Sequence, residues 1–470
     1  MVEQRAESVC GGRADTLVAM TERDEKRDRE EAEKDFVEAM EADSSLAVGV
    51  VPEDDGEKVS DGEGPAPIKR RKAAITFIFL TIALDMLAMG MIAPVLPKLI
   101  EGFVNGSAVR TAGYLGWFGT LWALMQFVCS PILGSLSDRF GRRPIVLLSN
   151  LGLGLDYLVM ALAPTIGWLF AGRIISGITA SSIPTAMAYG ADVTPKEKRA
   201  GVFGLLSGAF AIGFVLGPAI GGLLGNINPR LPFYASGGLS LVNFCYGLFV
   251  LPESLSKANR SPFSWKRANP VGSLVLLKRK TVLLGLAGVL LLAYVAQQCL
   301  MNVFVLYTDY RYHWTTRTVG ISLGVVGICS GIVGGLLVKR VVAKIGERRT
   351  MLIGMALGAG GYALFAASST GRLFWAGIPV LTGLSLLWPT AQSVMSRHVS
   401  ASEQGQLQGA INGLRGLAGL VGPGLFTAVF AFAISPGSWL PVAGLPFYMA
   451  SGMVLLGLGW ATWVTRGERV

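Results

Sequence analysis

The sequence predicts an all-α membrane protein in which twelve transmembrane helices form two six-helix pseudo-repeats. Three observations lead to this fold. Of the 470 residues, 51% are hydrophobic and 15% are charged, which is too apolar a balance for a water-soluble domain. Apolar segments of about 20 residues, the length that a helix needs to cross the hydrocarbon, recur along the chain. A shift of 205 residues aligns motifs of the first half with motifs of the second.

Residues 1–72 differ in composition from the rest of the chain. They hold 12 Lys/Arg and 20 Asp/Glu, whereas the remaining residues hold 29 and 11. Because such an acidic segment has too few apolar residues to bury a core, we expect a disordered cytoplasmic tail. It contains no apolar stretch typical of a signal peptide. A dispensable extension, or a true start at Met20, is the alternative to a regulatory role.

Twelve apolar segments follow, separated by short polar loops. Each is expected to be a helix, because backbone in contact with lipid must satisfy its own hydrogen bonds. The polar and basic residues 253–280 form a cytoplasmic linker between an N-terminal half, 73–252, and a C-terminal half, 281–470. The predicted helices cover residues 74–100, 113–134, 144–163, 166–190, 201–225, 232–252, 281–306, 319–338, 350–368, 372–394, 407–433 and 441–464.

Basic residues are distributed unevenly among the loops. If the N-terminus lies inside, the cytoplasmic loops and ends hold 25 Lys/Arg and the external loops hold six. The positive-inside rule therefore places both termini in the cytoplasm. We expect a multi-pass protein of the inner (plasma) membrane. The positive charge sits in short loops and not on a face with aromatic platforms, so we expect no nucleic-acid partner.

The loop between the second and third segments reads GSLSDRFGRRP. Three arginines in it can anchor the topology, but an anchor does not need Asp138. Two glycines permit a tight turn and close approach of helices. We interpret the loop as a conformational latch that joins the halves at the cytoplasmic face in one state only, and a plain topology anchor is the alternative. The latch residues are Gly134, Asp138, Arg139, Gly141, Arg142 and Arg143.

The shift of 205 residues aligns part of this loop with a stretch of the second half. The matched stretches are PTA at 184 and 389, GP at 217 and 422, and GRR at 141 against GER at 346. Asp138 falls on Ala343, so the second copy lacks the acid. Two parallel six-helix halves with a site between them are typical of transporters.

From about residue 74 to 465 the chain resembles the major facilitator superfamily, and within it the drug:proton antiporters of the tetracycline-resistance type. The resemblance rests on the basic loop, GFVLGPAIGG at 213–222, LDMLAMGMIAPVLP at 84–97, GRIISG at 172–177, LDY at 155–157, LPES at 251–254, YHW at 312–314 and GQLQG at 405–409. It implies export of a small amphipathic drug, tetracycline-like or one of several, in exchange for protons by alternating access. A proton-coupled importer, or an exporter of a native metabolite with the same fold, is the alternative.

Three ionisable residues lie inside predicted helices at similar depth. At about 1.5 Å per residue, Asp85 and Asp156 lie roughly 17 and 18 Å from the cytoplasmic end, and Arg173 lies roughly 20 Å from it. Charges within the hydrocarbon are costly and usually functional. Desolvation favours a neutral acid and a nearby guanidinium favours an ionised one. We therefore predict a site of proton coupling and substrate binding, with a fixed structural hydrogen bond as the alternative for Asp156.

Other residues are assigned to a substrate cavity or to helix packing. The predicted cavity residues are Gln126, Gln297, Gln298, Asn302, Trp388 and Gln392. Hydrogen bonding between helices is their alternative role. The antiporter motif, comprising Gly213, Gly217, Pro218, Gly221 and Gly222, is expected to pack and bend its helix without contacting substrate. Arg415, inside the segment 407–433, either balances an acid or faces a wet vestibule.

The sequence departs from the tetracycline exporters at one position. The resemblance implies an acid in helix 9, where this chain has Gly358. A drug other than metal-chelated tetracycline is therefore at least as plausible a substrate. We expect no cofactor and no metal site, with Mg²⁺ present only as part of a drug chelate. The expected partners are the substrate, protons and the lipid bilayer, and the expected state is a monomer.

Two other function classes are alternatives to transport. The stretch GISLG at 320–324 fits the G-x-S-x-G pattern of serine hydrolases. A hydrolase needs a base within reach of Ser322, and the two histidines, His313 and His398, fall in loops at opposite membrane faces. We therefore predict that the protein is not an enzyme. A membrane sensor that uses the acidic tail as its output is the other alternative.

Overall fold

The computed structural model describes residues 68–195, 198–263, 272–400 and 403–466. Throughout these ranges the regular structure is helical, without a strand. Twelve stretches within them are long and apolar enough to cross a membrane, which confirms the predicted all-α fold with twelve spans. Residues 1–67 of the predicted tail and 264–271 of the predicted linker lie outside the described ranges.

The first half of the described chain contains eight α-helices. They are α2 (Ile68–Ile92), α3 (Leu96–Phe103), α4 (Ala108–Phe140), α5 (Arg142–Leu162), α6 (Ile166–Thr179), α7 (Ser182–Val193), α8 (Arg199–Ile227) and α9 (Leu231–Val250). The expected first span, 74–100, is too long, because α2 ends at Ile92. Pro94 and Pro97 follow, and a proline cannot donate the backbone hydrogen bond that would continue the helix.

The second half begins after the short 3₁₀ helices η2 (Lys257–Asn259) and η3 (Gly272–Arg279). Its elements are α10 (Thr281–Tyr312), α11 (Thr316–Gly331), the π-helix η4 (Ile332–Leu337), α12 (Val338–Ile345), α13 (Glu347–Ala367), α14 (Gly371–Thr382), the 3₁₀ helix η5 (Gly383–Leu386), α15 (Leu387–Ser396), α16 (Gln404–Ile434) and α17 (Leu445–Val464). Two predicted spans of this half are thus interrupted, one by η4 and one by η5, and in the first half the predicted span 166–190 is interrupted between α6 and α7.

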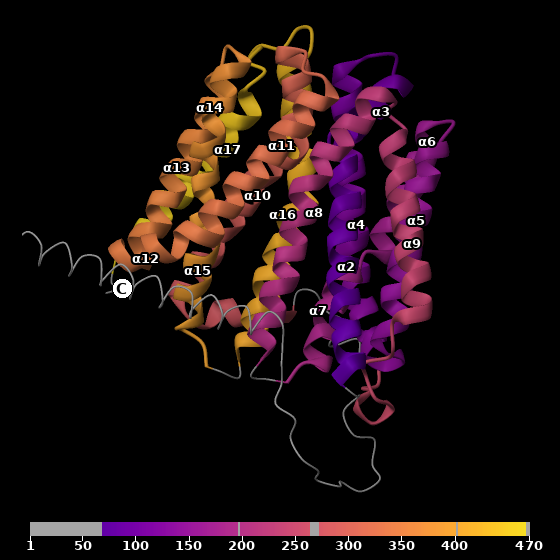
Figure 1. Ribbon diagram of the computed structural model, residues 1–470. Coiled ribbons are helices and arrows are strands. Elements are labelled where there is room, and N and C mark those ends of the chain that lie inside the picture. Colours follow the sequence, from indigo (N-terminus) through magenta and orange to yellow (C-terminus); the bar gives the residue numbers. More distant parts are fainter. Residues whose placement is uncertain (1–67, 196–197, 264–271, 401–402, 467–470) are drawn as a thin grey trace, which may run out of the picture. The chain divides into compact units, whose positions relative to one another are not determined.

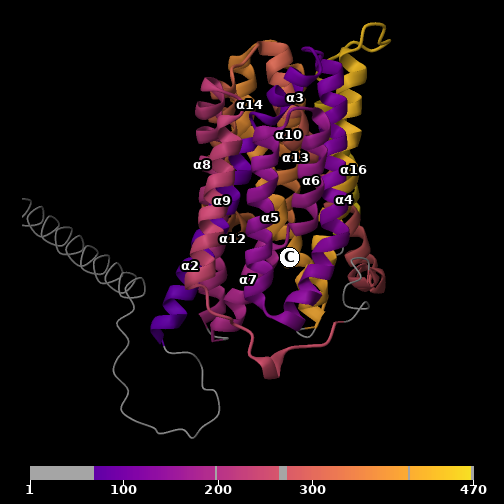
Figure 2. The same ribbon diagram turned by 90° about the vertical axis from the view of Figure 1, so that its right-hand side faces the viewer.

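Helix packing follows the internal repeat. Helix α2 packs on α8 and α9, as α10 packs on α16 and α17. Likewise, α5 packs on α6 and α9, and α13 packs on α14 and α17. Between the halves α4 packs on α16 and α11 packs on α8. The repeat relates α4 to α11 and α8 to α16, so these two contacts are equivalent. Figures 1 and 2 show the indigo-to-magenta helices of the first half beside the orange-to-yellow helices of the second.

The two ends of this helical bundle differ. At one end, which we call the Gly141 end, Gly141 alone separates α4 from α5, and Gly346 alone separates α12 from α13. Their φ angles are 110° and 79°, which favour glycine. We call the other end, where α3 lies in Figure 1, the Lys98 end. Here the halves approach closely, because a Cβ on Gly222 of α8 would lie 2.9 Å from the Cα of Gly320 of α11.

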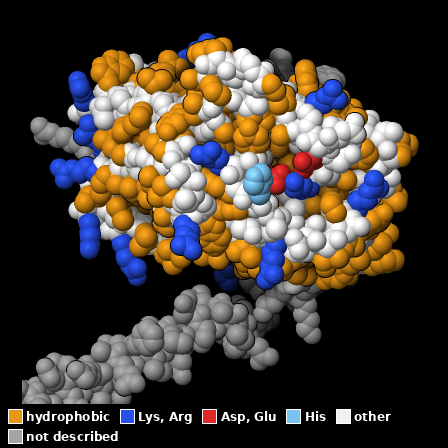
Figure 3. Space-filling view, turned by 90° about the horizontal axis from the view of Figure 1, so that it is seen from above, with side chains coloured by type: hydrophobic (Ala, Val, Ile, Leu, Met, Phe, Trp, Pro, Cys, Tyr) orange, Lys and Arg blue, Asp and Glu red, His pale blue; other side chains and the backbone are white. Residues whose placement is uncertain are grey.

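Large apolar side chains are exposed on the outside of the bundle. They include Ile227, Phe249 and Leu456. Seen from the Lys98 end, hydrophobic side chains also surround the periphery (Figure 3). Such a surface is unfavourable in water and matches contact with lipid tails.

Candidate functional site: a central cavity and its charged residues

A cavity of about 1940 Å³ lies between the two halves. Helices α2, α4, α6, α7 and α8 line it from one half, and α10, α11, α15 and α16 line it from the other. Its wall extends to the exposed Ser207, Gln406 and Gln408 near the Gly141 end. Toward the Lys98 end α8 lies against α11 and α4 against α16, where a Cβ on Gly116 would touch Thr427. The cavity therefore opens at the Gly141 end.

Amide side chains supply much of the polarity of this cavity. Gln126, Gln298, Asn302 and Gln392, all predicted as cavity residues, line it. The amide of Asn302 donates to the side-chain oxygen of Gln298 at 3.2 Å. The amide of Gln392 donates to the side-chain oxygen of Gln408 at 2.8 Å. These contacts link neighbouring helical turns of α10, and α15 to α16.

The two other predicted cavity residues do not line the cavity. Gln297 is turned by about 100° around α10 from Gln298. Trp388 instead stacks on Tyr294, with ring centroids 4.5 Å apart and an angle of 6° between the planes. The sequence places a residue at a depth in the membrane, but it does not fix the direction in which the side chain points.

A buried ion pair joins the cavity wall to α5. The Nη2 of Arg173 lies 2.8 Å from Oδ2 of Asp156. Arg173 lines the cavity and Asp156 is fully buried behind it. Glycine at position 172 makes room for the pair, because a Cβ there would lie 2.5 Å from Oδ1 of Asp156. Two of the three predicted coupling residues are therefore in direct contact.

Asp85 of α2 is the third predicted coupling residue. It is buried, and neither carboxylate oxygen has a hydrogen-bond partner among the described residues. The hydroxyl of Ser182 in α7 is the polar group that faces it. Tyr157 lies within electrostatic reach of Asp85, Asp156 and Arg173. Asp85 does not line the cavity.

The antiporter motif of α8 packs against α2. A Cβ on Gly217 would lie 2.7 Å from the Cα of Gly90, and one on Gly213 would lie 2.7 Å from the Cβ of Met86. A Cβ on Gly221 would touch the backbone of Met91. These glycines therefore set a close helix crossing. The fourth glycine, Gly222, faces α11 instead.

Pro218 of the same motif differs from its expected role. It lines the cavity, whereas the sequence led us to expect no place for the motif near substrate. The ring of Pro218 also lies against α2, because a Cβ on Gly90 would be 2.9 Å from its Cδ.

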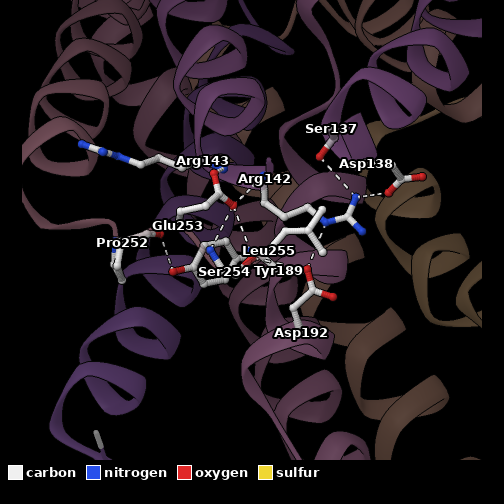
Figure 4. Close-up of polar contacts among 10 residues, drawn as sticks. All are labelled: Ser137, Asp138, Arg142, Arg143, Tyr189, Asp192, Pro252, Glu253, Ser254 and Leu255. Carbon is white, nitrogen blue, oxygen red and sulfur yellow. Dashed lines mark hydrogen bonds and ion pairs between the residues drawn. The ribbon is translucent and has the colours of Figure 1, made fainter. Parts of the chain in front are cut away.

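The basic loop forms a polar network within the first half (Figure 4). The Nη1 of Arg142 lies 2.5 Å from Oδ1 of Asp138, and its Nε lies 3.0 Å from Oδ2 of Asp192 in α7. Glu253, just after α9, accepts the backbone N–H groups of Arg142 at 2.8 Å and Arg143 at 3.3 Å. Because the first N–H groups of a helix lack partners within it, this carboxylate caps α5 at its positive end.

The expected latch between the halves is not formed in this conformation. The described contacts of Asp138 and Arg142 stay within the first half and the segment after α9, where Ser261 donates its N–H to the backbone oxygen of Asp138 at 3.1 Å. The latch is not formed because the cavity between the halves opens at the Gly141 end.

The other latch residues differ in their contacts. Gly141 makes the expected tight turn, but Gly134 lies inside α4, where a Cβ would meet nothing within 4 Å. Gly134 therefore makes no close helix approach. Arg139 lies over the ring of Phe140 at 5.1 Å, and Arg143 donates to the backbone oxygen of Leu248 at 2.6 Å.

The second half carries a counterpart with reversed charges. Oε1 of Glu347, the first residue of α13, lies 2.7 Å from Nη2 of Arg397, which follows α15. It also accepts the hydroxyl of Ser393 at 2.7 Å. A shift of 205 residues places Arg142 on Glu347 and Asp192 on Arg397. Sequence reasoning missed this exchange, although the repeat alignment contained it.

An ion pair joins the halves at the Lys98 end. The ammonium of Lys98 in α3 lies 2.8 Å from Glu101 and 2.8 Å from Asp309 of α10. Burial alone would lower the pKa of Lys98, but hydrogen bonds and charge from Asp309 and Glu101 raise it above its ordinary value of 10.5. Acidic side chains lie together with basic ones near the middle of this face in Figure 3. The sequence analysis did not predict this ion pair.

Arg415 of α16 faces the cavity, one of the two places that the sequence left open for it. Its guanidinium carbon lies 5.2 Å from the ring centroid of Tyr294. Tyr294 is the same ring that stacks on Trp388. Arg415 therefore belongs to an aromatic cluster at the wall between α10, α15 and α16.

The hydrolase alternative gains no support from the surroundings of its serine. Ser322 is buried in α11, and its hydroxyl donates to the backbone oxygen of Thr318 at 2.7 Å. Across the described ranges, no three His, Cys, Asp or Glu side chains gather in a way that could hold a metal ion.

Comparison with known proteins establishes the family. The sequence profile described as Major Facilitator Superfamily matches residues 78–423. The chain belongs to the major facilitator superfamily. It is therefore a multi-pass membrane protein whose relatives are transporters.

Individual members of the superfamily extend this result. The chain is 37% identical over 380 residues to the tetracycline resistance protein, class C, of Escherichia coli, covering 80% of this chain and 94% of that protein. It is 33% identical to the class B protein of Escherichia coli, covering 79% and 93%. Among solved structures, the nucleoside transporter NupG superposes with a TM-score of 0.68 at 14% identity, covering 85% of this chain and all of that one. The last match shows the shared superfamily fold.

Proposed function

We propose that this chain is a proton-coupled antiporter that exports a small amphipathic drug by alternating access. The observation that carries the proposal is a large cavity between the two halves beside two buried carboxyl groups of one half. The identity of 37% to a tetracycline resistance protein supports a drug as the substrate. We expect a monomer in the inner membrane.

The distribution of Lys and Arg supports an orientation with both termini in the cytoplasm. The Gly141 end then faces the cytoplasm, and the drug enters the cavity from that side. Closure of the Gly141 end and opening of the Lys98 end release the drug outside. Asp138 and Arg142 would contact the second half only in the closed state of the Gly141 end.

In this proposal Asp85 carries the proton. A buried carboxylate without a partner is costly while it is charged and acceptable when it is protonated. Arg173 is held by Asp156 at the cavity wall. A drug that draws Arg173 away from Asp156 and toward Asp85 would favour the ionised form of Asp85, and this links substrate binding to proton release.

The position of Gly358 bears on the substrate. It lies in α13 against η5, where a Cβ would be 2.8 Å from Cδ1 of Leu384. It does not line the cavity. Since no Asp or Glu stands among the described lining residues either, we expect transport that does not require a divalent cation, with Mg²⁺ entering only as part of a chelated drug.

The test uses inverted membrane vesicles with an imposed proton gradient and a pH-sensitive dye. A panel of amphipathic drugs, including tetracycline with and without Mg²⁺, is added to vesicles that contain the full-length protein. We expect at least one drug to evoke proton release, and Asp85→Asn to abolish that release. Glu403→Gln is the control, because it also replaces a carboxylate by an amide but lies outside the membrane spans, where Glu403 accepts hydrogen bonds from Ser400.

Two results would contradict the proposal. Silence across the whole panel in the wild-type protein would exclude a proton-coupled drug exporter with this substrate range. Normal drug-evoked release by Asp85→Asn would remove Asp85 as the proton carrier. Release by other drugs but never by tetracycline would support antiport and exclude tetracycline as the substrate.

A further inference from the structure

The cavity carries a positive charge that no acidic group among the described residues balances. Among the described residues that line it, two are charged, Arg173 and Arg415, and none is Asp or Glu. Arg173 is paired with Asp156 at 2.8 Å. Arg415 has no acidic partner among the described residues. The wall therefore has an excess of one positive charge, contributed by Arg415.

The position of Arg415 favours a role beyond solvation. It lies eleven residues after Gln404, the first residue of α16, which is about 16 Å along the helix at the usual rise. A cation at that depth is expensive and usually functional. Its side chain is exposed to the cavity, so its N–H groups are accessible. Low-dielectric walls around a solvent-accessible cation concentrate its field and raise the local concentration of anions.

The surroundings of Arg415 provide further contacts for a ligand. Tyr294 lies beneath its guanidinium at 5.2 Å and holds the group in place by a cation–π contact. One turn further along each helix, Gln298 of α10 packs against Gly419 and Gly422 of α16. Its amide lines the same wall. The wall thus combines a fixed guanidinium with a neutral amide that can donate or accept hydrogen bonds.

The other half completes this subsite. Phe127 of α4 lies beside α16 at this level, since a Cβ on Gly416 would be 2.9 Å from Cδ2 of Phe127. Phe127 also lines the cavity. An aromatic ligand bound at Arg415 therefore has an aromatic side chain of the opposite half beside it, and its binding would depend on how the two halves are placed.

We propose that Arg415 binds an ionised acid group of the substrate, and that the exported molecules are small aromatic organic anions or zwitterions. A guanidinium offers two parallel N–H donors that fit a carboxylate or a deprotonated enol. The ring system of the ligand packs against Phe127. This inference rests on the proposed export function and specifies its substrate class.

The test compares two probes that differ in charge alone, nalidixate and its uncharged carboxamide. Their affinities are measured by titration calorimetry with the full-length protein in detergent at pH 7.5. We expect nalidixate to bind at least about tenfold more tightly than the carboxamide, because charge-assisted hydrogen bonds are worth about one factor of ten or more. High salt should reduce this preference.

Variants at position 415 identify the residue. Arg415→Gln should lower nalidixate affinity about tenfold and leave carboxamide affinity unchanged. Unchanged carboxamide binding also shows that the variant is folded. Arg415→Lys should retain part of the preference, since it keeps the charge but loses the paired donors. Arg372→Gln, which makes the same change at an exposed residue of α14 outside the cavity lining, is the matched control and should keep the wild-type preference.

Several outcomes would overturn the inference. They are equal affinities of the two probes, a preference that survives in Arg415→Gln, and failure of the wild-type protein to bind nalidixate at all. The vesicle assay described above separates this failure from failure of the proposed function. Drug-evoked proton release without a preference for the acid would leave the antiporter and exclude the anion site. A preference for the acid without drug-evoked proton release would support the anion site and exclude the proton-coupled antiporter.

Discussion

Asp156 and Arg173 form a buried pair whose role is structural, functional or both. The carboxylate is fully buried, and the guanidinium is mostly so. Removal of one partner of such a pair leaves an uncompensated charge and costs about 3–5 kcal/mol. Removal of both charges costs less, because no unpaired charge is left. The comparison of single and double variants therefore separates stability from transport.

We expect Asp156→Asn and Arg173→Gln each to lower the thermal unfolding midpoint of the purified protein. The double variant should recover most of the loss, since two neutral amides can hydrogen-bond to each other. Drug-evoked proton release should remain lost in the double variant if the charges serve coupling. Full recovery of both stability and transport would show that the pair is only a structural contact.

At the residue scale, the sequence predicted the depth of a residue in the membrane better than the direction in which its side chain points. The helical rise placed Asp85, Asp156 and Arg173 at one level, and the structure brings Asp156 and Arg173 into contact. Direction depends on the helices that pack around each residue, which one-dimensional spacing does not contain. For this reason Trp388 was expected in the cavity wall. Glu253 was missed as the cap of α5 because its partners are 110 and 111 residues away.

Among the helical elements, the crossing of α2 and α8 depends on glycines. The Cα of Gly90 and a Cβ on Gly217 would be 2.7 Å apart, closer than any relaxed contact. Gly208 lies two and a half turns earlier on α8, where a Cβ would meet nothing within 4 Å. The same helix thus offers a crowded glycine and an unhindered one.

Gly217→Ala should destabilise the protein, and Gly208→Ala should not. The first change forces the two helices apart, which costs about 1–3 kcal/mol for overpacking in a close-packed site. The second is expected to be neutral or stabilising by up to about 1 kcal/mol, because alanine favours helix more than glycine does. The thermal unfolding midpoints of the two purified variants test this difference in stability. Equal midpoints would mean that α2 and α8 do not depend on this close approach.

The twelve spans followed from hydropathy because each has enough apolar residues to cross the membrane. Hydropathy did not predict the breaks within these spans. The turn after α2 depends on two prolines, whereas η4 contains Gly334 and Gly335 within an uninterrupted apolar run. A π-helical segment changes the register of a helix without changing its composition. Hydropathy therefore predicts how many spans there are and not where they bend.

At the scale of the whole molecule, the repeat relates two halves whose charges are not equivalent. The Arg142–Asp192 pair of the first half corresponds to the Glu347–Arg397 pair of the second, with the signs exchanged. The Gly141 end thus carries ion pairs of opposite polarity on the two halves. The Lys98 end has an ion pair between the halves, Lys98 with Asp309. When the Lys98 end opens, the ion pair between Lys98 and Asp309 must break. When the Gly141 end closes, the ion pairs of the two halves at that end must come together.

Lys98 should stabilise the conformation that opens at the Gly141 end. Because its pKa is raised above 10.5, its contribution is fully present below that value and is lost only at more alkaline pH. The conformational preference of the wild-type protein should therefore not change between about pH 6 and 9 on account of this residue. Lys98→Met should shift the population toward the opposite conformation, and Lys98→Arg should keep the wild-type preference.

Labelling from one side of the membrane measures this shift. A cysteine at Gln298, which lines the cavity, is introduced after the native cysteines are replaced. A membrane-impermeant maleimide is then applied at the Lys98 end. We expect labelling several times faster in Lys98→Met than in the parent protein. Equal rates would mean that the packing of α8 on α11 and of α4 on α16 closes this end without help from the ion pair.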